Sequence, residues 1–104
     1  MYKIIIADDE IHILRLIRRF AALENTMLVG EATNGIDAYN LTLERRPDIL
    51  ITDIFMPCMD GLKLSRLVKT ELPHIKILAL SERKEFQHIQ RAISIGITDF
   101  LPKP

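Results

Sequence analysis

Five short runs of aliphatic residues recur along this 104-residue chain, and each is bounded by polar residues, glycine or proline. Runs of this length and composition predict β-strands. Four of the five are almost continuously apolar, whereas a strand with one face in water alternates apolar and polar residues. We therefore expect strands that are covered on both faces and paired in parallel. The predicted strands are Ile4–Ala7, Met27–Val29, Ile49–Ile51, Ile77–Leu80 and Ile97–Leu101.

Segments with helical periodicity separate the strands. The first is amphipathic, begins near Asp9 or Glu10, and presents an apolar face made by Ile13, Leu14, Ile17, Phe20 and Ala21. Capping and stop signals bound three further helices. They are expected from Asn34-Gly35 to before Pro47, from Asp60-Gly61 to before Pro73, and from about Glu82 to Ile95 with a stop at Gly96.

The strict alternation of strands and helices with short loops predicts an α/β fold, a doubly wound five-stranded parallel sheet with helices on both faces. No segment for a fifth helix follows the last strand, so part of one sheet face is expected to stay open. An exposed apolar face of this kind favours a homodimer or an element exchanged between two copies.

Charge and cysteine content narrow the function classes. The chain has 14 Lys and Arg against 14 Asp and Glu, and it has no apolar run near the roughly 20 residues that span a bilayer. We expect neither direct nucleic-acid contact nor membrane insertion. The lone Cys58, expected in a loop, cannot form an internal disulfide, and the acids that follow the first apolar run exclude a secretory signal, so we expect a cytoplasmic location.

Polar residues follow the predicted strands at their carboxyl ends. They are Asp8 and Asp9 after the first strand, Asp53 after the third, Ser81 after the fourth and Lys103 after the fifth. Each could by itself be a helix cap or a surface residue. In an open parallel sheet, however, the carboxyl ends of the strands line the ligand crevice, so we expect these side chains to meet.

The chemistry of that set points to phosphoryl transfer. Crowded carboxylates need a cation, and a few oxygen ligands with room for water suit Mg²⁺. The three histidines, expected on the surface, do not pair with Cys58 at the spacing of a zinc site; they are His12, His74 and His88. Asp53 would be a carboxylate nucleophile, with Ser81 and Lys103 holding oxygens of the transferred group.

The four glycines are too scattered for a nucleotide-binding loop. Asp53-Ile54-Phe55 also lacks the second acid of aspartate-nucleophile phosphatases, so a phosphoaspartate should persist. Two alternatives remain open at this point: a true phosphatase or phosphotransferase, and a docking module that works without phosphorylation.

Four motifs, in order and at family spacing, give the chain a resemblance to the receiver domain of two-component response regulators over Tyr2 to Pro104. The motifs are Ala7-Asp8-Asp9-Glu10, Asp53-Ile54-Phe55-Met56-Pro57-Cys58-Met59-Asp60-Gly61, Leu80-Ser81 and Asp99-Phe100-Leu101-Pro102-Lys103-Pro104. The resemblance implies a flavodoxin-like fold with strand order 2-1-3-4-5. It also implies that residues 1–104 are one receiver domain, a fragment that stops before the last helix of a longer regulator.

The resemblance further implies a phosphorylation-activated switch rather than a metabolic enzyme. Asp53 would accept a phosphoryl group from a sensor histidine kinase, and Ser81 and Lys103 would bind its oxygens. Ser81 and Phe100 would relay the change to an output domain, expected to be a DNA-binding transcription regulator, and the Lys103–Pro104 bond would be cis. The Mg²⁺ ligands would be Asp8, Asp9, Asp53 and the backbone carbonyl of Phe55.

Two residues near the predicted site, and the basic face of the first helix, each lead to a further prediction. Glu82 stands where the family usually has a small residue, so loading from small phosphodonors should be slow. Phe55 either packs locally or shields the acyl phosphate from water. The arginines of the first helix either help to select the kinase or form a solvated face; they are Arg15, Arg18 and Arg19.

Overall fold

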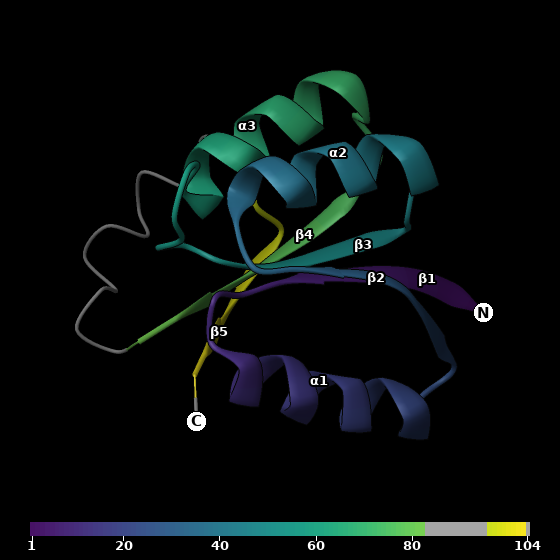
Figure 1. Ribbon diagram of the computed structural model, residues 1–104. Coiled ribbons are helices and arrows are strands. Elements are labelled where there is room, and N and C mark those ends of the chain that lie inside the picture. Colours follow the sequence, from purple (N-terminus) through teal and green to yellow (C-terminus); the bar gives the residue numbers. More distant parts are fainter. Residues whose placement is uncertain (83–95, 104) are drawn as a thin grey trace.

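Five parallel strands form one sheet with helices on both faces (Figure 1). The computed structural model describes residues 1–82 and 96–103. The predicted helix from Glu82 to Ile95 and the Lys103–Pro104 bond fall outside these residues. The elements are β1 (Tyr2–Ala7), α1 (Ile11–Leu23), β2 (Thr26–Ala32), α2 (Gly35–Arg45), β3 (Ile49–Asp53), α3 (Gly61–Glu71), β4 (Lys76–Ser81) and β5 (Asp99–Pro102).

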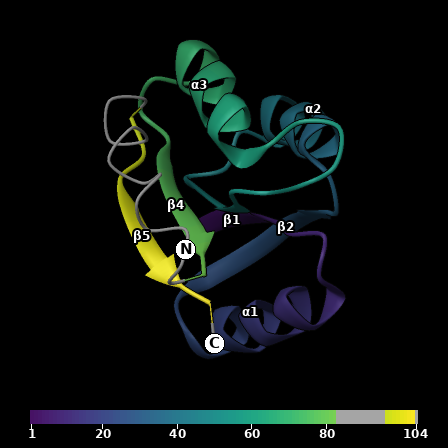
Figure 2. The ribbon, with the colours of Figure 1, turned by 90° about the vertical axis from the view of Figure 1, so that its left-hand side faces the viewer.

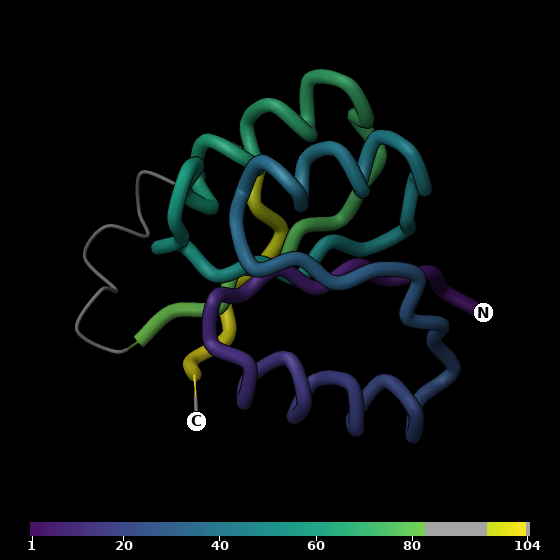
Figure 3. Tube along the Cα trace, viewed as in Figure 1, coloured from purple at the N-terminus to yellow at the C-terminus, as the bar shows by residue number. Residues whose placement is uncertain are grey.

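The strand order is β2-β1-β3-β4-β5, which confirms the predicted doubly wound topology. The tube in Figure 3 shows how the chain returns through a helix after β1, β2 and β3, so that the strands run toward the same edge of the sheet. In the strand register Ala7 lies beside Thr52, Asp53 beside Leu80, and Ser81 beside Pro102. The polar residues that follow the strands are therefore delivered to one edge.

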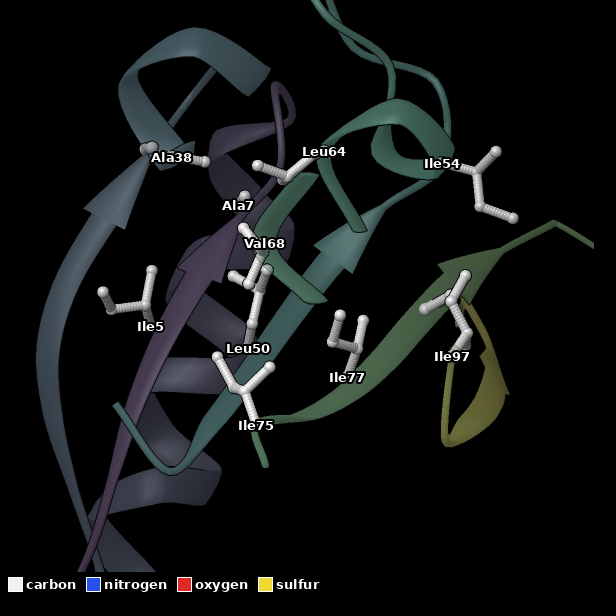
Figure 4. Packing of buried hydrophobic residues seen from close by; sticks show 12 residues of the cluster. Ile5, Ala7, Ala38, Leu50, Ile54, Leu64, Val68, Ile75, Ile77 and Ile97 are labelled. Carbon is white, nitrogen blue, oxygen red and sulfur yellow. The ribbon is translucent and has the colours of Figure 1, made fainter. Parts of the chain in front are cut away.

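The main core lies between the sheet and the layer formed by α2 and α3 (Figure 4). Ile5, Leu50 and Ile77 lie side by side on the neighbouring strands β1, β3 and β4, and all three are fully buried. Leu64 and Val68 of α3 pack over them, and their spacing of four residues places them on one helical face. Burying side chains of this size stabilises the fold by about 1.5–3 kcal/mol each.

The opposite face of the sheet is covered only in part by the described helices. In Figures 1 and 2, α1 is the helix of the described part of the chain that lies on this side. Beside it is an apolar hollow of about 220 Å³ whose lining includes Ile51 and Leu78. Among the described helices, α1 packs mainly against β1 and β2, so Ile51 and Leu78 line this hollow.

The apolar face predicted for α1 was right in part. Ile13, Leu14 and Ala21 are buried, but Phe20 is 60% exposed. Phe20 is one of the residues that line the apolar hollow.

The predicted boundaries of the other elements are close to those observed. Asn34 and Asp60 cap α2 and α3 as expected, since their side chains accept hydrogen bonds from the backbone N–H groups of Asp37 and Lys63. The fifth strand begins later than predicted. Ile97 is buried but precedes β5, and the hydroxyl of Thr98 accepts the N–H of Ile77, an interaction that a sequence pattern does not reveal.

Cys58 is an exposed loop residue, as predicted, and its backbone is in the left-handed region with φ of 70°. A residue with a β-carbon is strained there, whereas glycine is not. We predict that Cys58→Gly raises the free energy of unfolding by about 1 kcal/mol in urea titrations. Cys58→Ser keeps the β-carbon and should give no gain, so equal stabilities for the two variants would contradict the strain.

Candidate functional site

The carboxyl ends of four strands bring the predicted polar residues together. Asp8 follows β1, while Asp53 and Ser81 are the last residues of β3 and β4. Lys103 follows β5, and its backbone N–H donates to the carbonyl of Ser81 at 2.9 Å. Residues that are 95 positions apart in the chain thus share one site, as the sequence analysis expected.

Three aspartates form a cluster of oxygen ligands. One carboxylate oxygen from each of Asp8, Asp9 and Asp53 lies within 4.8 Å of the others. Asp8 and Asp53 are buried and Asp9 is exposed. The Oδ2 atom of Asp8 accepts no hydrogen bond, although Lys103 lies 3.1 Å away. A buried oxygen with unused lone pairs beside two further carboxylates fits a hard divalent cation such as Mg²⁺.

Lys103 carries the positive charge at the centre of this site. Its Nζ atom lies 3.1 Å from Oδ2 of Asp53 and 3.1 Å from Oδ2 of Asp8. The lysine side chain is only 8% exposed. A buried ammonium beside buried carboxylates offsets part of the cost of removing all these charges from water.

Among the described residues, the closest partner of Lys103 is Glu10, which the sequence placed near the start of the first helix but not in the site. Oε2 of Glu10 lies 2.6 Å from the lysine Nζ. Glu10 is the N-cap residue of α1, and its own backbone N–H donates to Oδ1 of Asp8 at 2.9 Å. A third consecutive acid after β1 was the available signal, but the sequence could not show which acid faces Lys103.

Burial and neighbouring charges shift the pKa values in the site. Burial, reinforced by the charge of Asp8, raises the pKa of Asp53 to about 6, although Lys103 opposes this. Burial also raises the pKa of Asp8. The hydrogen bond from Lys103 lowers the pKa of Glu10. Burial disfavours the charged Lys103, yet its bonds to Glu10, Asp53 and Asp8 leave its pKa above the usual value.

Ser81 is placed at the same edge with its hydroxyl unused. The side chain is fully buried, and its Oγ atom has no hydrogen-bond partner. A buried hydroxyl without a partner is costly unless a group enters the site to bond with it. The position of Ser81 thus fits the predicted role of binding an incoming oxygen.

The site opens to solvent through a hollow of about 180 Å³. Its lining includes Phe55 and Glu82, the two residues singled out at the rim. Phe55 is 51% exposed, and Glu82 is also exposed. A larger hollow of about 450 Å³ lies elsewhere, next to Tyr2 and Lys76 at the amino ends of their strands, and it shares no residue with this site.

Gly61 lets the loop after β3 approach the strand closely. A β-carbon at this position would lie 2.0 Å from the backbone oxygen of Asp53, and the N–H of Gly61 donates to the carbonyl of Ile54. Because a side chain cannot fit there, the glycine helps to fix the backbone around Asp53.

The remaining predicted site residue, Phe100, lies on the edge strand β5. Its ring is partly buried and packs against the main core. It is not among the residues that line the hollow at the phosphoryl-acceptor candidate Asp53.

The family of the chain follows from comparison with known proteins. Residues 4–104 match the model of the response regulator receiver domain. The chain belongs to this family. Receiver domains are signalling domains, which confirms the prediction that this chain is a signalling domain.

Two comparisons show how near the relatives are. The uncharacterized transcriptional regulatory protein YesN of Bacillus subtilis is 39% identical over 106 residues, which cover 100% of this chain and 29% of YesN. The REC domain of AraT, a response regulator from Geobacillus stearothermophilus, superposes with a TM-score of 0.93 at 37% identity and covers 99% of this chain and 81% of that one. The chain thus spans less than a third of the length of YesN.

None of the helices in the described part of the chain is both long enough and apolar enough to cross a bilayer.

The pKa of Asp53 predicts how stability depends on pH without a divalent ion. Its folded-state value of about 6 exceeds the ordinary 3.8, so the folded state binds this proton more tightly, and stability falls as the pH rises from about 4 to 6. Asp53→Asn should therefore be more stable than wild type at pH 8, by roughly 2–3 kcal/mol, with the gain lost below pH 4.

Urea unfolding in EDTA between pH 3.5 and 8 measures this difference. Glu44→Gln removes one carboxylate from the exposed face of α2 and serves as the control. A constant difference between wild type and Asp53→Asn across this range would contradict the pKa shift of Asp53.

Proposed function

We propose that this chain is a phosphorylation-activated switch in which Asp53 accepts a phosphoryl group from a sensor histidine kinase. The observation that carries the proposal is the placement of the Lys103 ammonium 3.1 Å from Oδ2 of Asp53, beside three clustered aspartates. A nucleophilic carboxylate, a cation and a ligand set for a divalent ion are the groups that phosphoryl transfer to a carboxylate needs.

In the proposed reaction a carboxylate oxygen of Asp53 attacks the phosphorus of the donor. The bond from phosphorus to the donor nitrogen or oxygen breaks, and an acyl phosphate forms on Asp53. Lys103 and Ser81 are positioned to bind the phosphoryl oxygens. No general acid is needed within the described residues when the leaving group is as good as imidazole or acetate.

Asp8, Asp9 and Asp53, with the backbone carbonyl of Phe55, are the residues that we propose to hold Mg²⁺. When bound, the ion supplies positive charge that stabilises the phosphoryl oxygens in the transition state. Asp8 and Asp53 are fixed at the ends of β1 and β3, so their oxygens need little rearrangement to become ligands.

The switch itself is proposed to run through Ser81 and Phe100. Phosphorylation adds about 1.5–2 negative charges and new acceptor oxygens. The buried Ser81 hydroxyl then gains a partner, and a contact made in only one state can shift a two-state equilibrium. Because β4 and β5 pair directly, a movement of Ser81 is transmitted to the strand that carries Phe100.

The output domain is proposed to be a DNA-binding transcription regulator that lies outside these 104 residues. YesN, of which this chain matches 29%, is named as a transcriptional regulatory protein. We propose a cytoplasmic location, where the exposed Cys58 would stay reduced. A homodimer through the open apolar face remains a prediction.

Intact mass after incubation with acetyl phosphate and Mg²⁺ tests the acceptor role. Wild type should gain one phosphoryl group, and Asp53→Asn should gain none, because the amide is not a nucleophilic carboxylate. EDTA should suppress the reaction in wild type. Equal labelling of wild type and Asp53→Asn would place the acceptor elsewhere, and no labelling of a folded wild type would favour a docking module.

A second prediction concerns the rim of the site. Glu82 adds a negative charge to the hollow through which a small anionic donor enters. Glu82→Ala should label several times faster with acetyl phosphate than wild type, at low ionic strength and saturating Mg²⁺. Equal initial rates for the two proteins would show that Glu82 does not limit access.

A further inference from the structure

Glu10 makes the shortest of the ion pairs that Lys103 forms with the described residues, yet Glu10 is not one of the three clustered aspartates. Lys103 contacts three carboxylates among the described residues: Asp8, Asp53 and Glu10. A lysine ammonium has three N–H donors, so these partners can use all of them. A divalent ion bound to the aspartates would affect the contact of each of these three carboxylates with Lys103 differently.

Asp8 and Asp53 both belong to the aspartate cluster that would hold a divalent ion, and both also face Lys103. The Oδ2 atoms of both residues lie 3.1 Å from the lysine Nζ. An ion bound to these carboxylates would withdraw their charge from Lys103 and would also repel the ammonium. Phosphorylation of Asp53 would weaken the contact between its carboxyl group and Lys103 further, because a phosphorylated carboxyl group no longer carries its own negative charge.

Glu10 does not lose its charge in this way. It lies outside the candidate ligand cluster, and its carboxylate is 2.6 Å from the lysine Nζ. Its backbone is fixed at the start of α1 and bonded to Asp8, so the position of the carboxylate is defined. The side chain of Lys103 is 8% exposed, whereas that of Glu10 is 42% exposed, so Glu10 holds the buried ammonium from the solvent side.

We propose that Glu10 is a positioning residue that keeps the ammonium of Lys103 at the phosphoryl-binding position while a divalent ion occupies the aspartates. The proposal rests on the acceptor function proposed for Asp53. The N–H group of Lys103 that faced Asp53 then donates to a phosphoryl oxygen instead, while the bond between Lys103 and Glu10 persists. Glu10 touches neither the phosphorus nor the attacking oxygen, and it acts through Lys103.

If Glu10 acted only through its negative charge, its removal would strengthen anion binding instead of weakening it. Removing an acid from an acidic pocket should help an anion to bind. Removing a carboxylate that holds Lys103 in place should weaken anion binding. The probe is beryllofluoride, an anionic phosphoryl analogue, titrated at saturating Mg²⁺ and followed by backbone amide NMR shifts.

We expect Glu10→Gln to weaken beryllofluoride binding roughly fivefold to tenfold and to slow acetyl phosphate labelling by a similar factor. Glu82→Gln removes one charge from the same hollow and is the matched control, expected to bind beryllofluoride at least as tightly as wild type. Glu10→Asp keeps the charge but is one methylene shorter. It should also bind beryllofluoride less tightly, with a Mg²⁺ dissociation constant close to that of wild type.

Two results would overturn the positioning role. One is a Glu10→Gln protein that binds beryllofluoride as tightly as wild type or more tightly. The other is a Glu10→Asp protein that matches wild type, because the 2.6 Å contact would then be dispensable. A folded wild type that neither binds beryllofluoride nor accepts a phosphoryl group would instead refute the acceptor function, and the role of Glu10 would fall with it.

Discussion

Charge balance at the carboxyl edge of the sheet is the constraint on which the site depends. Asp8 and Asp53 are buried there within a few ångströms of each other, and two ionised carboxylates in such a place repel and lose hydration. Lys103 offsets part of that cost, with Glu10 as its nearest partner. Burial and Asp8 raise the pKa of Asp53 although Lys103 opposes this, so a cation bound beside Asp53 would favour its ionised form.

The parallel sheet is what makes this concentration of charge possible. Its strands run toward the same edge, so residues after β1, β3, β4 and β5 meet without any long loop. The core between the sheet and the layer of α2 and α3 holds the strands in register. Its rigidity fixes the backbone of Asp53, and Gly61 lets the following loop pass close beneath it. The apolar layer therefore stabilises the fold, whereas the carboxyl edge of the sheet carries the reactive groups.

The two faces of the sheet are unequal. One is covered by α2 and α3, whereas α1 leaves Ile51 and Leu78 beside an apolar hollow on the other. The strands β4 and β5, through which the proposed switch would run, pair directly at the end of the sheet. Ser81, with an unused buried hydroxyl, and Phe100, partly buried against the core, are both on these strands.

Local sequence determined most of the elements and the identity of the site. The aliphatic runs specify buried strands, Asn34 and Asp60 specify helix starts through their capping side chains, and parallel topology then requires Asp8, Asp53, Ser81 and Lys103 to converge. Tertiary structure alone decided the exposure of Phe20, the late start of β5 and the pairing of Glu10 with Lys103. These depend on distances between segments up to 93 residues apart, and hydrophobic periodicity and capping signals report only on neighbours within a few residues.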